Sequence, residues 1–318
     1  MTWVGPGDGV DTWLHSCAEA EEIIRIAASS GTTKRVILLP AYPPGKTLTM
    51  IGRVYTTIDL SRDGAVAHLR LNRPERRNAL THDMMLELED AFARVRDDAT
   101  CRVLVLRGTG GHFCAGGDLD AMADMPPTPG KGAKDPLVPA YRQFGDALLA
   151  LDALPQATIA VVEGSAVGGG FGMACCSDVV ILHDSARFGL PEPKVGFIPS
   201  QVIPFVVRRL GEGPVRDLAV TGRVIDATEA HRLGIGRYLC CSAAEIDATL
   251  GALLDDIQKM EPQALATAKR LVLASATGDD RAVLDDAAES LVGLLRRPEA
   301  AEGIRAFKAK TLPGWTKR

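Results

Sequence analysis

The sequence is poor in aromatic residues and carries no strong excess of one charge. Phe, Trp and Tyr make up 5% of the 318 residues, and the formal net charge is −4. This slightly acidic balance argues against a general attraction to nucleic acid or anionic membranes, so we expect neither as a partner. Hydrophobic residues at 46% and charged residues at 24% are ordinary for a globular protein of one large or two small domains.

Cysteine motifs and targeting segments are also missing. The seven Cys form no CxxC pair, and no two His stand at the spacing of metal ligands. The pattern predicts neither a disulfide framework nor a metal site, which favours a reducing compartment. The N-terminus has acids where a signal peptide has Lys or Arg, and no apolar stretch is long enough to span a bilayer. We therefore expect a cytoplasmic protein.

The chain divides into three zones. Residues 1–50 are an N-terminal extension of unknown role, residues 51–242 form the main domain, and residues 243–318 are helical in pattern. The extension contains a helix-like segment, Trp13–Ala28, and a short apolar run, Val36–Leu39. A poorly ordered leader or a mis-assigned start is the alternative interpretation of this zone.

The main domain alternates short β-rich runs with helical segments. Val54–Leu60 and Ala65–Leu71 predict a hairpin, and Thr81 is expected to cap a helix that runs to Asp97. Further buried strands are expected at Cys101–Gly108, Thr158–Val162 and Asp178–Leu182. Repeated β-β-α units of this kind indicate an α/β fold with several stacked turns.

Two other stretches stand out by composition. Met125–Pro139 is rich in Pro, Gly and Lys, which predicts a surface loop, and a lid is one interpretation of it. The last zone predicts a layer of helices over Ile246–Met260, Ala264–Ser275 and Ala282–Leu295.

Two glycine-rich turns are candidates for an anion site. In His112–Leu119 a turn follows a strand, and Asp118 is placed to cap the next helix. In Glu163–Gly172 three consecutive Gly open an apolar helix, in a pattern that is neither a Walker loop nor GxGxxG. A plain turn and close helix–sheet packing are the alternatives. Together, one exposed N–H from each turn would make an oxyanion hole, worth about 3 kcal/mol per donor in the transition state.

Glu192 is the candidate general base. It lies between apolar residues and prolines in Phe188–Pro199, and such surroundings raise the pKa of a carboxyl group. A solvent-facing Glu in a loop is the alternative. His112, His183 and His231 are isolated and are interpreted as surface or capping residues, and Cys175 with Cys176 as core.

Four motifs carry a resemblance to a known family. They are NRPERRNAL (Asn72–Leu80), FCAGGDL (Phe113–Leu119), EGSAVGGGFGMACCSDVVI (Glu163–Ile181) and FGLPEPKVGFIP (Phe188–Pro199). In this order and at these intervals they resemble the crotonase, or enoyl-CoA hydratase/isomerase, superfamily from about Val54 to the C-terminus. The first 50 residues are not part of the resemblance.

The resemblance implies an α/β crotonase-type spiral of ββα units with a C-terminal helical trimerisation layer, assembled as a homotrimer or a dimer of trimers. It implies a coenzyme A thioester as substrate and no separately bound cofactor. By position, Ala115 and Gly169 are similar to the two oxyanion N–H donors, and Glu192 to a catalytic acid or base. The residues expected to bind the substrate or its CoA are Arg76, Ala79, Asp118, Gly168, Phe307 and Lys310. Phe307 and Lys310 are expected to reach the CoA of a neighbouring subunit.

One departure from the family pattern bears on the reaction. Typical hydratases of the family use two glutamates, and Gly172 stands in place of the first. Members with a single Glu include enoyl-CoA isomerases, feruloyl-CoA hydratase-lyases and carboxymethylproline synthases. The segment from Phe188 resembles a branch that includes isohexenylglutaconyl-CoA hydratase. We therefore rank hydration of a branched or bulky enoyl-CoA first, isomerase, lyase or decarboxylase chemistry second, and a non-catalytic acyl-CoA-binding protein third.

Overall fold

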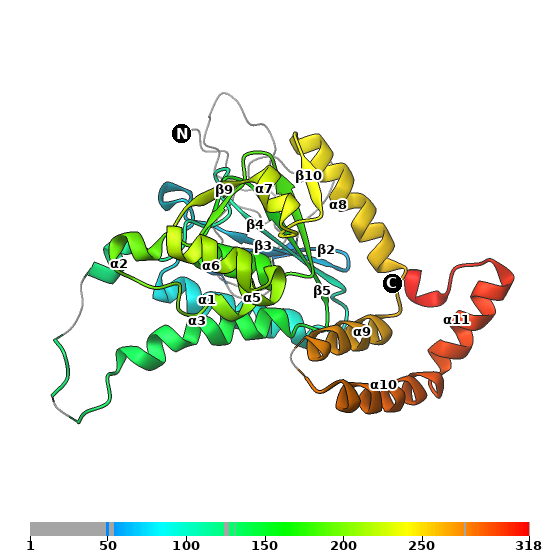
Figure 1. Cartoon of the computed structure of the whole chain (residues 1–318). Coiled ribbons are helices and arrows are strands. Elements are labelled where there is room, and N and C mark those ends of the chain that lie inside the picture. Colours follow the sequence, from blue (N-terminus) through cyan, green and yellow to red (C-terminus); the bar gives the residue numbers. More distant parts are fainter. Residues whose placement is uncertain (1–48, 51–53, 124–126, 131, 277, 318) are drawn as a thin grey trace, which may run out of the picture.

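The computed structural model describes residues 49–50, 54–123, 127–130, 132–276 and 278–317 (Figure 1). Within these residues the chain is a mixed α/β protein, as the sequence predicts, and no helix is long and apolar enough to cross a membrane. Both segments noted in the N-terminal extension, Trp13–Ala28 and Val36–Leu39, lie outside the described residues.

A seven-stranded sheet forms the centre of the molecule. Its strand order is β1-β2-β3-β4-β5-β7-β10, with antiparallel pairing at β1–β2 and β2–β3 and parallel pairing from β3 onward. The strands are β1 (Thr49–Met50), β2 (Ile58–Asp63), β3 (Val66–Leu71), β4 (Val103–Gly108), β5 (Ala157–Val162), β7 (Val179–His183) and β10 (Tyr238–Cys240). Parallel strands joined through helices agree with the α/β fold that the sequence predicts.

The predicted hairpin is confirmed, but its first strand begins at Ile58 instead of Val54. The backbone N–H groups of Thr56 and Thr57 donate to the carboxylate of Glu87 at 2.7 and 2.9 Å. These donors are therefore bound by a helix side chain and not by a neighbouring strand. This contact is not readable from the local β pattern.

A smaller sheet lies beside the first and carries the second glycine turn. It has the order β6-β8-β9, from β6 (Ser165–Val167), β8 (Arg187–Gly189) and β9 (Val224–Asp226). β6 leads directly into α4 (Gly169–Cys176), and β8 is followed by the short 3-10 helix η2 (Glu192–Val195). The small sheet thus brings the triple glycine and Glu192 to the same edge.

Helices on one side of the main sheet enclose the larger core. They are α1 (His82–Asp97), α3 (Leu137–Asp152), α4, α5 (Ile203–Leu210), α6 (Glu212–Thr221) and α7 (Ala227–Arg232). α1 begins where predicted, since the Thr81 side chain accepts a hydrogen bond from Met84 N–H at 3.3 Å. Its predicted apolar positions Met84, Leu88 and Phe92 are buried against the sheet. Periodicity and cap together account for this helix.

Among the described residues, α8 (Ala243–Gln258) forms most of the cover on the other side of the main sheet, with Leu265 of the following helix beside it. Val66, Val105 and Val161 point to this side, where they form a second apolar cluster with Ile246 of α8. Neighbouring strand residues face the larger core, because side chains alternate across a strand.

The remaining C-terminal helices bury little of their surface. α9 (Pro262–Ser275) and α10 (Asp280–Leu295) have no buried residue, and α11 (Pro298–Ala309) has only Ala306. Figure 1 shows α10 and α11 extending away from the sheets, before the chain closes with the short 3-10 helix η3 (Gly314–Lys317). The helical layer predicted from the sequence is present, and its role in assembly stays a prediction.

Candidate active site

The two glycine turns predicted separately lie side by side. Cys114 N–H donates to the carbonyl oxygen of Ser165 at 2.7 Å, and Val167 N–H donates to that of Cys114 at 3.1 Å. The turns approach so closely that a Cβ atom on Gly116 would lie 3.1 Å from the Val167 carbonyl oxygen. Glycine is therefore needed for contact between the turns.

Glu192 lies against the start of the triple glycine. A Cβ atom on Gly168 would lie 2.3 Å from Oε1 of Glu192, and Gly168 has φ +51°, a value that side chains disfavour. Any other residue at position 168 would displace the carboxylate and strain the turn. The positive N-terminal end of α4 faces the same place.

The Glu192 carboxyl group is poorly solvated. Its Oε2 atom is buried and has no hydrogen-bond partner among the described residues. Burial raises the pKa of this carboxyl above its usual value, opposed only by a hydrogen bond from its own backbone N–H. An ionised carboxylate that is removed from water without a partner destabilises the folded protein. A raised pKa, however, suits a group that gives and takes protons near neutrality.

Gly169 meets the predicted requirement for a free backbone donor. It is the first residue of α4, and the N–H groups of a first helical turn have no partner within the helix. No described residue accepts a hydrogen bond from Gly169 N–H.

Ala115 lacks the free donor that the sequence analysis assigned to it. Its N–H donates to the carbonyl oxygen of Arg77 at 3.0 Å, so its one proton is engaged. Two residues on, Gly117 pairs with Leu80 in a parallel bridge. The Leu80 N–H donates to Gly116 O at 2.7 Å, and the Asp118 N–H donates to Leu80 O at 2.9 Å. The Gly117 N–H points the other way and has no acceptor in the described chain. Gly117 is therefore the donor that the geometry offers.

Asn78, which the sequence pattern does not single out, holds the loop that contains Arg77. It is buried, has φ +57°, and donates to the carbonyl oxygens of Thr109 and His112 at 2.9 and 2.7 Å. His112 in turn accepts from Ser165 N–H at 3.1 Å. These bonds fix the loop before α1 against both glycine turns.

Asp118 caps its helix, as the sequence predicts. Its carboxylate accepts from the N–H groups of Asp120 and Ala121 at 3.2 and 3.3 Å in α2 (Leu119–Ala123) and pairs with Arg73 at 2.9 Å. Burial opposes ionisation, but the bonds from Arg73 and Ala121 hold the pKa of Asp118 below its usual range. The carboxylate is fully occupied by the fold, so direct contact with substrate stays a prediction.

The other predicted substrate-binding residues differ in where they lie. Arg76 ends the 3-10 helix η1 (Pro74–Arg76), is 55% exposed and pairs with Asp120 at 2.7 Å. Ala79 is buried, and its carbonyl oxygen accepts from Arg73 at 2.6 Å. Both belong to the loop that holds the glycine turns together.

Phe307 and Lys310 do not join this cluster within one chain. Phe307 is 86% exposed on α11, and Lys310 ends that helix with φ +54°. Figure 1 places α11 and α2 at opposite ends of the molecule. A role for these two residues therefore requires a second subunit.

Position 172 has no room for the missing acid. A Cβ atom on Gly172 would lie 2.5 Å from Cγ1 of Val202 and 3.4 Å from Leu148. A Cβ atom on Gly169 would likewise meet Leu80 at 2.3 Å. Apolar side chains thus cover the glycine face of α4, and Glu192 is the carboxylate that reaches it.

The described residues were also considered as metal ligands and as reactive thiols. The part of the chain that the structure describes contains no group of three or more His, Cys, Asp or Glu suited to a metal ion. Burial raises the pKa of the Cys114 and Cys175 thiols to about 12, so both stay protonated and act as core residues.

Comparison with known proteins gives consistent matches over the same part of the chain. The family model described as enoyl-CoA hydratase/isomerase matches residues 61–318. A putative enoyl-CoA hydratase of Thermus thermophilus is 34% identical over 258 residues, covering 79% of this chain and 97% of the relative. Carnitinyl-CoA dehydratase of Proteus mirabilis is 33% identical over 268 residues, covering 82% of this chain and 99% of the relative.

Solved structures show the same fold. An enoyl-CoA hydratase/isomerase from Marinobacter aquaeolei matches with TM-score 0.78 at 40% identity, over 82% of this chain and 99% of that chain. Pseudomonas aeruginosa AtuE matches with TM-score 0.78 at 41% identity, over 82% of this chain and 100% of that chain.

Proposed function

The chain belongs to the enoyl-CoA hydratase/isomerase family, and on that premise we propose that it adds water to a branched or bulky enoyl-CoA. The observation that carries the proposal is the half-buried Glu192 carboxyl beside the N-terminus of α4, whose Oε2 atom is buried and has no hydrogen-bond partner among the described residues. A carboxyl group in this state is poised to exchange protons with a bound molecule, because no described residue donates to its Oε2 atom.

The proposed oxyanion donors are the N–H groups of Gly117 and Gly169. Each comes from one glycine turn, and neither has an acceptor among the described residues. Hydrogen bonds from both to the thioester oxygen would stabilise the charge that develops there as the enolate forms. Gly117 replaces Ala115 in this role because the Ala115 N–H is bonded to Arg77.

A single carboxylate can complete the hydration. Glu192 removes a proton from water as the water oxygen bonds to the β-carbon of the enoyl group. The electrons of the double bond move toward the thioester and form the enolate. Protonated Glu192 then gives the proton to the α-carbon, which regenerates the carboxylate and leaves H and OH from one water on the product.

Apolar residues next to Glu192 favour a bulky acyl group. Val195, Phe197 and Ile198 follow it and are 55%, 40% and 73% exposed. Exposed apolar side chains this close to a reacting group offer a surface for an apolar chain. Together with the likeness to the branch that hydrates isohexenylglutaconyl-CoA, they support a branched or bulky substrate.

Arg76 is the proposed contact for the CoA phosphates, with Ala79, Gly168 and Asp118 in the adjoining loops. Its guanidinium is largely exposed and its partner Asp120 is 73% exposed, so a phosphate can compete for it. We propose that Phe307 and Lys310 serve the CoA of a neighbouring subunit in a homotrimer or dimer of trimers. The CoA thioester is the substrate itself, and no further cofactor is part of the proposal. A cytoplasmic location stays a prediction.

Isomerase, lyase or decarboxylase chemistry is the second candidate, and it is favoured by the glycine at position 172. An isomerase moves one proton between two carbons and needs only one acid or base. The packing of Val202 against Gly172 excludes a second carboxylate at that position.

The test is product analysis in heavy-oxygen water with straight-chain, branched and carboxylated enoyl-CoA substrates. The hydratase proposal expects a hydroxyacyl-CoA that carries the heavy oxygen, with the largest yield from branched substrates. An unlabelled, isomerised or shortened product would overturn hydration in favour of the second candidate. Inertness toward the whole panel with CoA binding retained would indicate a non-catalytic acyl-CoA-binding protein.

Glu192→Gln is the matched variant for this assay. It keeps the size of the side chain and removes its ability to accept a proton, so turnover should fall by about 100-fold or more while substrate binding is retained. Near-normal turnover in this variant would remove Glu192 from the mechanism.

A further inference from the structure

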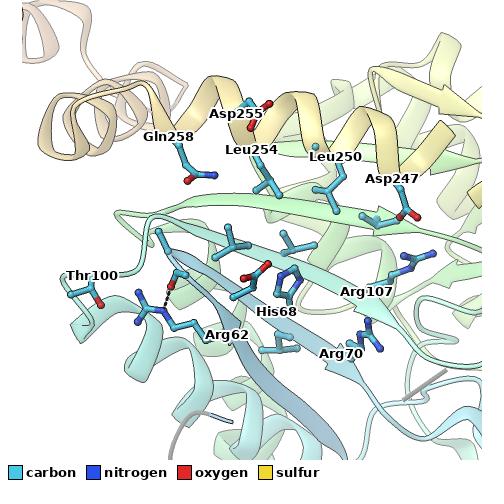
Figure 2. Close-up of a pocket in the computed structure, with 18 residues that line it drawn as sticks. Arg62, His68, Arg70, Thr100, Arg107, Asp247, Leu250, Leu254, Asp255 and Gln258 are labelled. Atoms are coloured by element: carbon cyan, nitrogen blue, oxygen red, sulfur yellow. Dashed lines mark hydrogen bonds between the residues drawn. The ribbon is translucent and has the colours of Figure 1, made fainter. Parts of the chain in front are cut away.

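A cavity of about 640 Å³ lies on the side of the main sheet away from Glu192, between the strands and α8 (Figure 2). Val66, Val105 and Val161 form its apolar floor. Arg62, His68, Arg70 and Arg107 stand around them on β2, β3 and β4. A cavity of this size is comparable with the sites that bind small molecules or short peptide segments.

The opposite wall is one face of α8. Leu250 and Leu254, one helical turn apart and half-buried, point toward the strands in Figure 2. Asp247 and Asp255 line the cavity from the same helix, and neither carboxylate has an ion pair or hydrogen bond with a described residue. The helix wall therefore combines leucine side chains that are only partly buried with carboxylates that have no partner among the described residues.

The described chain begins with β1 at the edge of this cavity. In the β1–β2 pair, Thr49 lies opposite Arg62, and Arg62 lines the cavity. Thr49 therefore lies next to the rim of the cavity, and residues 1–48 precede it in the sequence.

We propose that the apolar run Val36–Leu39 of the same chain docks in the cavity between α8 and the sheet. Residues 40–48 separate the run from β1, and nine extended residues reach about 30 Å. The cavity face of α8, from Asp247 to Gln258, is about 17 Å long. The run can therefore reach every part of the cavity.

The chemistry of the run matches the apolar floor of the cavity and its α8 wall. Its four residues Val-Ile-Leu-Leu are all aliphatic, so docking removes them and the Leu250 and Leu254 side chains from water. Lys34 and Arg35 directly precede the run and supply the positive charge that Asp247 and Asp255 lack. Docked in this way, the extension holds α8 to the sheet just before the chain enters α9.

Disulfide trapping in the full chain tests the proposal. Leu38→Cys is combined with Leu254→Cys, in a background where Cys17→Ser and Cys241→Ser remove the other reactive thiols. The matched control combines Leu38→Cys with Ala252→Cys, an exposed position on a different face of the same helix. Docking raises the local concentration at Leu254, so oxidation should link that pair within one chain about tenfold faster than the control pair.

Equal rates for the two pairs would overturn the proposal. Links between two chains instead of within one would also overturn it, because a second copy would then be the occupant. A small molecule retained in native mass spectra, without cross-linking, would assign the cavity to a ligand.

A second measurement does not depend on cysteine geometry. Hydrogen exchange is compared between the wild-type chain and Leu38→Asp, which places a charge inside the proposed contact. Backbone amides of α8 around Leu250–Leu254 should exchange about tenfold faster in the variant, with α1 unchanged as the internal control. Unchanged exchange in α8 would contradict docking. Both experiments are independent of Glu192 and of the proposed reaction.

Discussion

At Glu192 the stability of the fold and the proposed chemistry have opposite requirements. Burial disfavours its charged form, so the pKa of the carboxyl is higher in the folded protein than in the unfolded chain. Its contribution to stability is therefore fully present below the unfolded pKa and is lost as pH rises through the folded pKa. Above the ordinary pKa of Glu this residue therefore lowers the stability of the fold.

The raised pKa of Glu192 gives a prediction for thermal stability. Glu192→Gln should raise the melting temperature at neutral pH, because it removes the cost of a buried charge. The gain should shrink and vanish below about pH 4, near the ordinary pKa of Glu. Thermal unfolding followed across this pH range is the measurement. The control is Glu289→Gln, an exposed side chain of α10, which should leave the melting temperature unchanged at every pH.

The same residue gives a prediction for the rate. A general base must be ionised, so kcat/KM should fall as pH falls through the raised pKa of Glu192. The pH–rate profile of the wild-type chain with its best substrate tests this. An acid limb at or below the ordinary pKa of Glu would contradict the link between burial and function.

At the scale of elements, α4 depends on close packing by its neighbours. Val202, which directly precedes α5, fills the space beside Gly172, while Leu80 and Glu192 abut the first two glycines. A helix with a glycine face can approach a carboxylate and a substrate more closely than one with side chains. The apolar neighbours then keep water from the same surface.

We expect Gly172→Ala to lower the free energy of unfolding by about 1–3 kcal/mol, the usual cost of overpacking a core. In a Val202→Ala background the added methyl has room, so the same substitution should cost less. Chemical denaturation of the four proteins of this double-mutant cycle measures the coupling. Gly213→Ala in α6 is the control, since a Cβ there meets nothing within 4 Å and should be neutral or slightly stabilising. Additive effects at 172 and 202 would contradict the packing argument.

At the scale of the whole molecule, the C-terminal helices expose apolar side chains that a monomer leaves uncovered. Those on α9, α10 and α11 include Val272, Leu284, Leu291, Leu295, Ile304 and Phe307. Exposed apolar surface of this extent is typical of a subunit interface. The expected assembly covers it with other copies of the chain.

Light scattering should therefore give a mass of three or six times 33.8 kDa. Leu291→Glu, which places a charge in the expected interface, should shift the mass toward that of one chain. Glu289→Gln on the same helix should leave the mass unchanged. A monomeric wild-type protein would contradict the proposed trimer.

Phe307→Ala tests whether the neighbouring subunit completes the CoA site. It should raise KM for the CoA substrate, with kcat and the melting temperature nearly unchanged, because Phe307 is 86% exposed within its own chain. An unchanged KM would exclude Phe307 from the site.

The sequence by itself determined the features that depend on near neighbours. The spacing of Met84, Leu88 and Phe92 with Thr81 before them defines α1, because a helix needs only one apolar face and a cap. The triple glycine marks a close backbone approach, and prolines with apolar residues around Glu192 indicate a raised pKa. These inferences need no knowledge of distant residues.

Only the tertiary structure decided which atoms are available at the site. Whether Ala115 or Gly117 has a free N–H depends on the register of the loop that contains Arg77 and Leu80. That register is set by hydrogen bonds between segments far apart in the sequence, fixed in part by the buried Asn78. A local pattern shows that a turn exposes a donor, but the direction in which each N–H points follows from long-range pairing.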